Sequence, residues 1–112
     1  MDIDGVRDIL RRHAHLYRRA YVYGSVARGS QDEASDVDLV LVRETTLPFF
    51  DRLREVFDLV DELGRADVLI YTEDEEQRLR REPGRYFVKD VFASGVLIEG
   101  TQGRGASMAA AG

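Results

Sequence analysis

The sequence of 112 residues has the length of one small domain, because domains of roughly 100–200 residues are the norm. A hydrophobic content of 44% and a charged content of 33% indicate a globular protein and exclude wholesale disorder. The absence of cysteine excludes disulfide scaffolds, thiolate metal sites and cysteine nucleophiles. The net charge of −5 argues against nucleic acid as a partner, since binding to phosphate backbones relies on cationic surface.

Neither a membrane span nor a signal peptide is expected. No apolar run approaches the roughly 18 residues that a span needs. The chain begins Met1-Asp2-Ile3-Asp4, which has neither the basic nor the apolar region of a signal peptide. These features predict a cytoplasmic protein without membrane contacts.

The first half of the chain predicts one helix and two strands. Residues 4–17 carry apolar side chains at three- and four-residue steps, the pattern of an amphipathic helix, and Asp2 or Asp4 is suited to cap it. Residues 20–23 and 37–42 are short β-prone runs and are predicted to be strands.

The second half predicts a long helix, a third strand and two shorter helices. Residues 49–63 keep helical spacing over four turns, with Pro48 suited to the first turn and Gly64 to the position after the last. Residues 66–71 form the third predicted strand. The elements that follow are a helix that Thr72 and Glu75 cap, ending near residue 82, a helix over residues 85–94, and a short edge strand over residues 96–99.

This order predicts an α/β (α+β) domain with a small mixed sheet of three to four strands and flanking helices. The domain is expected over residues 1–99, followed by a disordered Gly/Ala-rich tail over residues 100–112. The aromatic side chains are expected in the core, although two adjacent phenylalanines of the long helix cannot both face inward, so that one of them marks an exposed apolar patch. The residues concerned are Tyr21, Tyr23, Phe49, Phe50, Phe57, Phe87 and Phe92.

A candidate phosphate site follows the first strand, in the segment Gly24-Ser25-Val26-Ala27-Arg28-Gly29. A strand that ends in Gly-Ser and turns into a helix offers backbone N–H groups and a hydroxyl to an anion. The guanidinium of Arg28 adds a cation to the same phosphates. Taken alone, the segment is better explained as an ordinary strand–helix turn with a serine cap.

A candidate metal site opens the second strand, in the segment Ser35-Asp36-Val37-Asp38-Leu39. Side chains alternate along a strand, so Asp36 and Asp38 share a face, with Cα atoms about 6.5–7 Å apart. Carboxylates this close are able to share two divalent metal ions about 3.5–4 Å apart. A third carboxylate, Asp67, opens the third strand, which completes the parts that two-metal phosphoryl transfer requires.

Together these motifs resemble the minimal nucleotidyltransferases of the DNA polymerase β superfamily, over roughly residues 5–99. The resemblance implies the polymerase β-like nucleotidyltransferase fold and transfer of a nucleoside monophosphate, AMP from ATP or from another nucleoside triphosphate, to a hydroxyl. It also implies the residue roles: Gly24 and Ser25 hold the phosphates, with Arg28 as an additional contact. Asp36, Asp38 and Asp67 are the catalytic ligands of two Mg²⁺ ions, with Asp67 also helping to activate the acceptor hydroxyl.

The resemblance further implies a partner. Minimal nucleotidyltransferases of the HEPN-associated type act as antitoxins of type VII-like toxin–antitoxin pairs and adenylylate a tyrosine of a helical HEPN toxin. A chain of 112 residues has no length for the second helical domain of larger relatives, which suggests a homo- or hetero-oligomer. The alternative is an antitoxin without catalysis, which neutralises its HEPN partner by occlusion.

Overall fold

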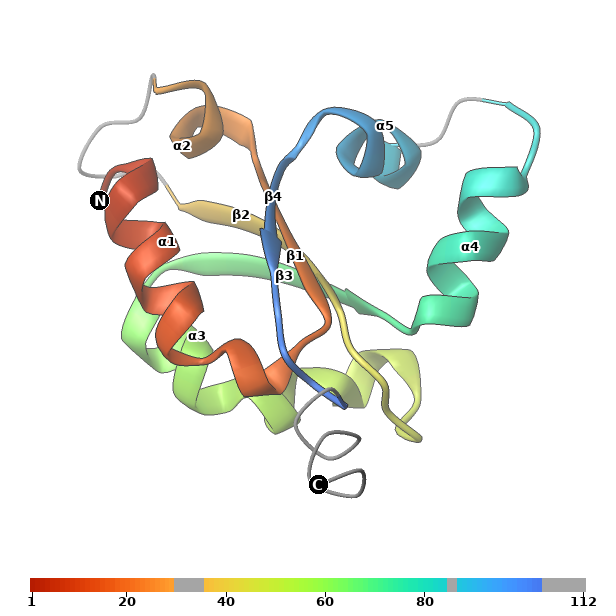
Figure 1. The fold of residues 1–112 in the computed structure, drawn as a ribbon, viewed down its shortest axis with the longest axis horizontal. Coiled ribbons are helices and arrows are strands. Elements are labelled where there is room, and N and C mark those ends of the chain that lie inside the picture. Colours follow the sequence, from red (N-terminus) through yellow and green to blue (C-terminus); the bar gives the residue numbers. More distant parts are fainter. Residues whose placement is uncertain (30–35, 85–86, 104–112) are drawn as a thin grey trace, which may run out of the picture.

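The computed structural model describes residues 1–29, 36–84 and 87–103 (Figure 1). The elements in chain order are α1 (Ile3–Arg12), η1 (Ala14–Leu16), β1 (Arg19–Tyr23), α2 (Gly24–Arg28), β2 (Val37–Val42), η2 (Phe49–Val56), α3 (Phe57–Leu63), β3 (Ala66–Tyr71), α4 (Glu73–Arg81), α5 (Phe87–Ser94) and β4 (Val96–Glu99), where η denotes a 3₁₀ helix. Among the described helices, none has the length and apolar character that crossing a membrane requires.

The four strands form one mixed sheet in the order β3-β2-β1-β4. β1 lies antiparallel to both of its neighbours, whereas β2 and β3 are parallel. A parallel pair needs a crossover connection, which η2 and α3 supply here. The predicted small mixed sheet is confirmed, and β4 is the edge strand that residues 96–99 suggested.

Helices cover both faces of the sheet (Figure 1). On one face, α1 and α3 pack against alternate strand residues in the larger apolar cluster, which includes Leu10, Leu39 and Leu59. On the other face, α5 and the side chain of Leu79 from α4 pack against Tyr21 and Val40. The alternation of side chains along each strand assigns every strand residue to one of these two layers.

The long helix predicted over residues 49–63 is instead two elements, η2 and α3. Residues three apart are eclipsed in a 3₁₀ helix, so Phe49 shares a face with Arg52, and Phe50 shares another with Leu53. Arg52 is buried, and its guanidinium donates to the carbonyls of Leu47 (2.9 Å) and Ile70 (3.1 Å). The prediction was wrong here because a helix of 3.6 residues per turn was assumed. The predicted helix over residues 4–17 likewise ends at Arg12, and η1 follows.

Three of the aromatic side chains expected in the core are exposed. Tyr21 and Phe92 are buried as predicted, but Phe50 is 93% exposed, Phe57 64% and Phe87 60%. Of the two adjacent phenylalanines, Phe49 is the half-buried one and Phe50 the exposed one, which confirms that only one faces inward. At Phe50 and Phe57 periodicity fails because the change of helix type at Phe57 changes which residues face the sheet.

The end of β4 is tied to the segment between α1 and β1. The amide of Gly100 donates to the carbonyl of Arg18, and that of Gln102 to the carbonyl of Tyr17. A Cβ at position 100 would lie 2.0 Å from the Tyr17 carbonyl oxygen, so only glycine fits there. Hydrogen bonds thus continue past the expected start of the tail, and residues 104–112 of that tail lie outside the described residues.

Polar contacts fix α4 against the sheet. The predicted capping box is present: Thr72 accepts from the amide of Glu75, and the Glu75 carboxylate accepts from the amide of Thr72. One turn further, the buried carboxylate of Glu76 accepts hydrogen bonds from Arg19 (2.7 Å), Tyr21 (2.7 Å) and Arg80 (3.1 Å). Burial alone would raise the pKa of Glu76, but these three hydrogen bonds outweigh it and lower the pKa below its ordinary value.

We expect Glu76→Gln to lower the free energy of unfolding at neutral pH by about 1–3 kcal/mol, because the buried Tyr21 and the partly buried Arg19 lose a charged acceptor. The lowered pKa means that this stabilisation is present above the ordinary value of 4.5 and is lost as the pH falls through the folded-state pKa. The difference between wild type and variant, measured by urea unfolding, should therefore shrink in acid. Asp74→Asn, an exposed acid on the same helix, should cost less than about 0.5 kcal/mol.

Candidate active site

The predicted site residues lie at one end of the sheet, where β1 ends and β2 and β3 begin. Gly24 and Ser25 open α2 directly after β1. Asp36 is the residue before β2, and Asp38 and Asp67 are the second residues of β2 and β3. Residues far apart in the sequence therefore reach one edge through the sheet topology.

Asp38 and Asp67 are direct neighbours on the parallel strands β2 and β3. Asp38 is also the cross-strand partner of Tyr23 on β1, so the three side chains leave the same face of the sheet. Burial raises the pKa of Asp38 above its ordinary value, and the charges of Asp67 and then Asp36 raise it further, while Arg28 opposes the shift. The two carboxylates thus form a local excess of negative charge that favours a cation or proton.

Gly24 is required by the position of the Asp38 carboxylate. Its φ of +75° is unfavourable for residues with a side chain. A Cβ at this position would lie 2.2 Å from Oδ2 of Asp38. The turn and the acid therefore depend on each other: the carboxylate occupies the space that any larger residue in the Gly-Ser motif would need.

Asp36 is paired with an arginine that the sequence analysis did not assign to the site. Arg65 precedes β3 as Asp36 precedes β2, and Nε of Arg65 lies 3.1 Å from Oδ1 of Asp36. Oδ1 is shielded from solvent and accepts no hydrogen bond from the described residues. The pairing follows from the parallel register, in which the amide of Val37 donates to the carbonyl of Arg65.

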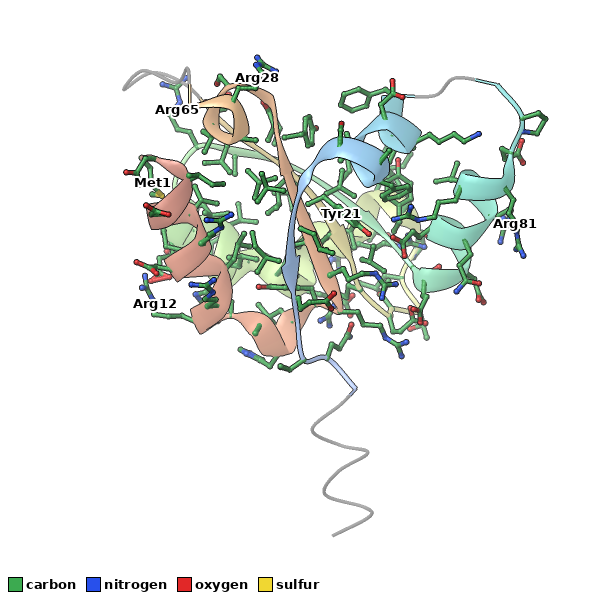
Figure 2. The ribbon with its side chains drawn as sticks, turned by 45° about the horizontal axis from the view of Figure 1, so that its top comes forward. Met1, Arg12, Tyr21, Arg28, Arg65 and Arg81 are labelled. Carbon is green, nitrogen blue, oxygen red and sulfur yellow. The ribbon has the colours of Figure 1, made fainter. Side chains whose placement is uncertain are left out.

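Ser25 and Arg28 lie on α2, beside the acids. Ser25 is half-buried and Arg28 is exposed. Figure 2 shows Arg28 and Arg65 at the same end of the molecule, so two guanidinium groups flank the acidic edge. Among the described residues no side chain caps the start of α2, so its hydrogen-bond donors are not taken up by a capping side chain.

A cavity of about 560 Å³ adjoins these residues. Gly24, Arg28 and Asp38 line it on one side. The opposite wall belongs to α5, which the sequence analysis predicted as a helix but did not connect to the site; its lining residues include Phe87, Asp90, Val91 and Ser94. Only the packing of α5 on β1 reveals this wall, because no motif in its sequence signals binding.

The donor atoms at this edge are of the type that a divalent metal ion prefers, although the side chains that carry them are not gathered into one cluster. No group of three or more acidic or histidine residues in the described part of the chain is positioned to hold a metal ion. The chemistry of the donors nevertheless suits Mg²⁺, which prefers carboxylate oxygens. Asp38 and Asp67 face each other with unbalanced charge, and Asp36 carries a shielded oxygen that accepts no hydrogen bond from the part of the chain that the structure describes.

The chain is similar to known proteins over most of its length. The family model for the polymerase β nucleotidyltransferase domain matches residues 6–102. A Methanocaldococcus jannaschii protein, provisionally named a protein adenylyltransferase, is 36% identical over 58 residues, which are 51% of this chain and 62% of that protein. The chain thus spans less than two thirds of that relative. A crystal structure of a provisionally assigned nucleotidyltransferase from Sulfolobus solfataricus aligns with 72% of this chain and 82% of its own, at 24% identity and a TM-score of 0.48.

Two glycines with nearly equal positive φ angles allow the contact between Gly24 and Asp38 to be tested. An alanine would have a strained backbone at either Gly24 (φ +75°) or Gly29 (φ +73°). A Cβ at Gly29, however, has no atom within 4 Å among its described surroundings. We expect Gly29→Ala to cost about 1–2 kcal/mol of unfolding free energy from backbone strain alone. Gly24→Ala should cost more and displace the Asp38 carboxylate. Equal losses in urea unfolding would show that the carboxylate does not need this space.

A second prediction concerns the repulsion between Asp38 and Asp67. Because the folded-state pKa of Asp38 is raised, its contribution to stability is present below the ordinary pKa and is lost as the pH rises through the folded-state value. Asp67→Asn removes one cause of the shift and should raise the melting temperature without metal by about 2 °C near pH 7.

The effect of Asp67→Asn should disappear at acid pH, where Asp38 is protonated in both proteins. Asp61→Asn, an exposed acid on α3, serves as the matched control and should leave the melting temperature nearly unchanged. Thermal unfolding in a metal chelator measures both. A lower melting temperature for Asp67→Asn near pH 7 would contradict the repulsion.

Proposed function

The chain belongs to the polymerase β nucleotidyltransferase family, and on that premise we propose that it transfers the nucleoside monophosphate of a nucleoside triphosphate, ATP in the first instance, to a hydroxyl group. The observation that carries this proposal is the direct opposition of Asp38 and Asp67 on parallel strands, beside the Gly24-Ser25 turn. Carboxylates next to a phosphate-binding turn are the combination that phosphoryl transfer requires.

Each residue at this edge of the sheet has its own role in the proposed reaction. Gly24 and Ser25 hold the β- and γ-phosphates, and Arg28 offsets negative charge on the leaving group. Asp36, Asp38 and Asp67 would hold Mg²⁺, which supplies charge neutralisation at the phosphates and orients the acceptor. Asp67 is exposed, so its carboxylate is accessible to a hydroxyl that enters from solvent and is able to take up its proton.

The bonds that change are confined to the α-phosphorus. The acceptor oxygen forms a bond to it while the bond to the oxygen bridging the α- and β-phosphates breaks, and pyrophosphate leaves with that bond's electron pair. The acceptor proton passes to the carboxylate and then to water. No covalent enzyme intermediate is needed, so positioning and charge stabilisation provide the catalysis.

The acceptor we propose is a tyrosine of a helical HEPN-type partner protein, in the cytoplasm, with this chain as the antitoxin of the pair. The resemblance to HEPN-associated minimal nucleotidyltransferases supports this assignment. The provisional name of the Methanocaldococcus jannaschii relative, a protein adenylyltransferase, is consistent with a protein acceptor. The partner would complete the site as a hetero-oligomer and present the hydroxyl at the exposed Asp67.

The proposal is tested by incubating the chain with Mg²⁺, labelled ATP and the HEPN-type protein, and by following label transfer. Asp38→Asn should reduce the transfer rate by roughly 10²-fold or more, because loss of a metal ligand removes several kcal/mol of transition-state stabilisation. Asp61→Asn, an exposed acid on α3 that does not line the cavity, is the control and should retain the rate.

Two outcomes would contradict the proposal. The first is the absence of transfer from any of the four nucleoside triphosphates to any partner protein by the wild-type chain. The second is full neutralisation of a toxic partner by an Asp36→Asn/Asp38→Asn double variant in co-expression. That result would mean that occlusion alone suffices and that the acids are not used for catalysis.

A further inference from the structure

The cavity beside the acidic edge has two chemically different ends. At one end lie Gly24, Arg28 and Asp38, which the proposed function assigns to phosphates and metal. Towards α5 the lining becomes largely apolar, with Val22, Val91 and Val96 among its residues. A cavity of about 560 Å³ falls within the range of small-molecule sites. A charged triphosphate gains little from the apolar end.

An exposed aromatic ring stands at that apolar end. Phe87 begins α5 and is 60% exposed, whereas Val88, Val91 and Phe92 of the same helix are buried. Its ring packs edge-on against Tyr23, with centroids 5.2 Å apart and planes at 74°. Because this contact is edge-on rather than face-to-face, the rings of Tyr23 and Phe87 are not stacked on one another, and both residues line the cavity.

We propose that the α5 side of this cavity is the subsite for the nucleoside of the donor nucleotide, with the base stacked on Phe87. This inference rests on the proposed function. The α-phosphorus must lie beside Asp38 for transfer to occur, and the nucleoside is bonded to the α-phosphate. The nucleoside must therefore occupy space next to Asp38, and the cavity that Asp38 lines extends from there to Phe87.

The polar groups of this wall suit a neutral nucleoside better than a further phosphate. Asp90 and Ser94 line the cavity from α5. A carboxylate accepts hydrogen bonds from ribose hydroxyls or from exocyclic amino groups, whereas it repels a phosphate. Arg28 is the one cation among the described lining residues, and it lies at the opposite, phosphate end.

The inference is tested by measuring the binding of ATP and of inorganic tripolyphosphate, each with Mg²⁺, by isothermal titration calorimetry. Phe87→Ala should weaken ATP binding by roughly 5- to 100-fold, the range expected for loss of one base–aromatic stack. Tripolyphosphate binding should not change. Phe87→Tyr keeps the ring and should retain the affinity for ATP.

Phe57→Ala is the matched control. Phe57 is also the first residue of its helix and is 64% exposed, close to the 60% of Phe87, but it does not line the cavity. It should leave both affinities unchanged, and circular dichroism verifies that each variant is folded.

The outcomes separate the inference from the proposed function. Unchanged ATP binding by Phe87→Ala would overturn the inference, and so would equal weakening of ATP and tripolyphosphate. A raised KM for the acceptor with unchanged ATP affinity would assign the cavity to the acceptor and would equally overturn it. In all three cases label transfer by the wild type leaves the proposed function standing. A wild-type chain that neither binds nor transfers from any nucleoside triphosphate would instead refute the proposed function.

Discussion

The site is built around the close approach of the Asp38 carboxylate to the backbone of Gly24. The carboxylate lies where a Cβ of residue 24 would stand, which couples the turn after β1 to the start of β2. The antiparallel register then places Tyr23 beside Asp38, and the parallel register places Asp67 on its other side. Burial and like charge raise the pKa of Asp38, so the folded chain holds a destabilising charge that bound cations would relieve. Asp38 weakens the fold at this point, as expected of a residue that is selected for function rather than for stability.

The far wall of the cavity depends on a polar network at the other end of the sheet. The Glu76 carboxylate accepts hydrogen bonds from both Tyr21 and Arg80. The Arg80 guanidinium also lies over the ring of Phe92, 4.9 Å from its centroid. Phe92 belongs to α5 and packs edge-on against Tyr21 of β1. The ion pairs of α4 therefore help to hold α5 on the sheet. Since α5 also carries Phe87, contacts distant from the acids contribute to the width of the cavity that we assign to the nucleoside.

The prediction of individual elements succeeded where local chemistry is strong. The cap at Asp2, the capping box at Thr72 and the strand over residues 37–42 are all present. Prediction failed for residues 49–56, where a 3₁₀ helix with a buried arginine replaces the first half of the expected α-helix. Arg52 counts as polar in any hydrophobic pattern. Its burial depends on the carbonyl of Ile70 and the carboxylate of Glu75, and both partners come from segments that only the folded chain brings near.

Local patterns were enough to predict the fold class, the family and the candidate residues, because the Gly-Ser turn and the acids that open two strands have recognisable spacing. How these residues are arranged in space depends on the folded chain. The register of β2 and β3 places Asp38 opposite Asp67 and pairs Asp36 with Arg65. The packing of α5 across the end of β1 adds Phe87, Asp90 and Ser94 to the site. Strand register and helix packing depend on contacts between residues distant in the chain, and no local pattern encodes them.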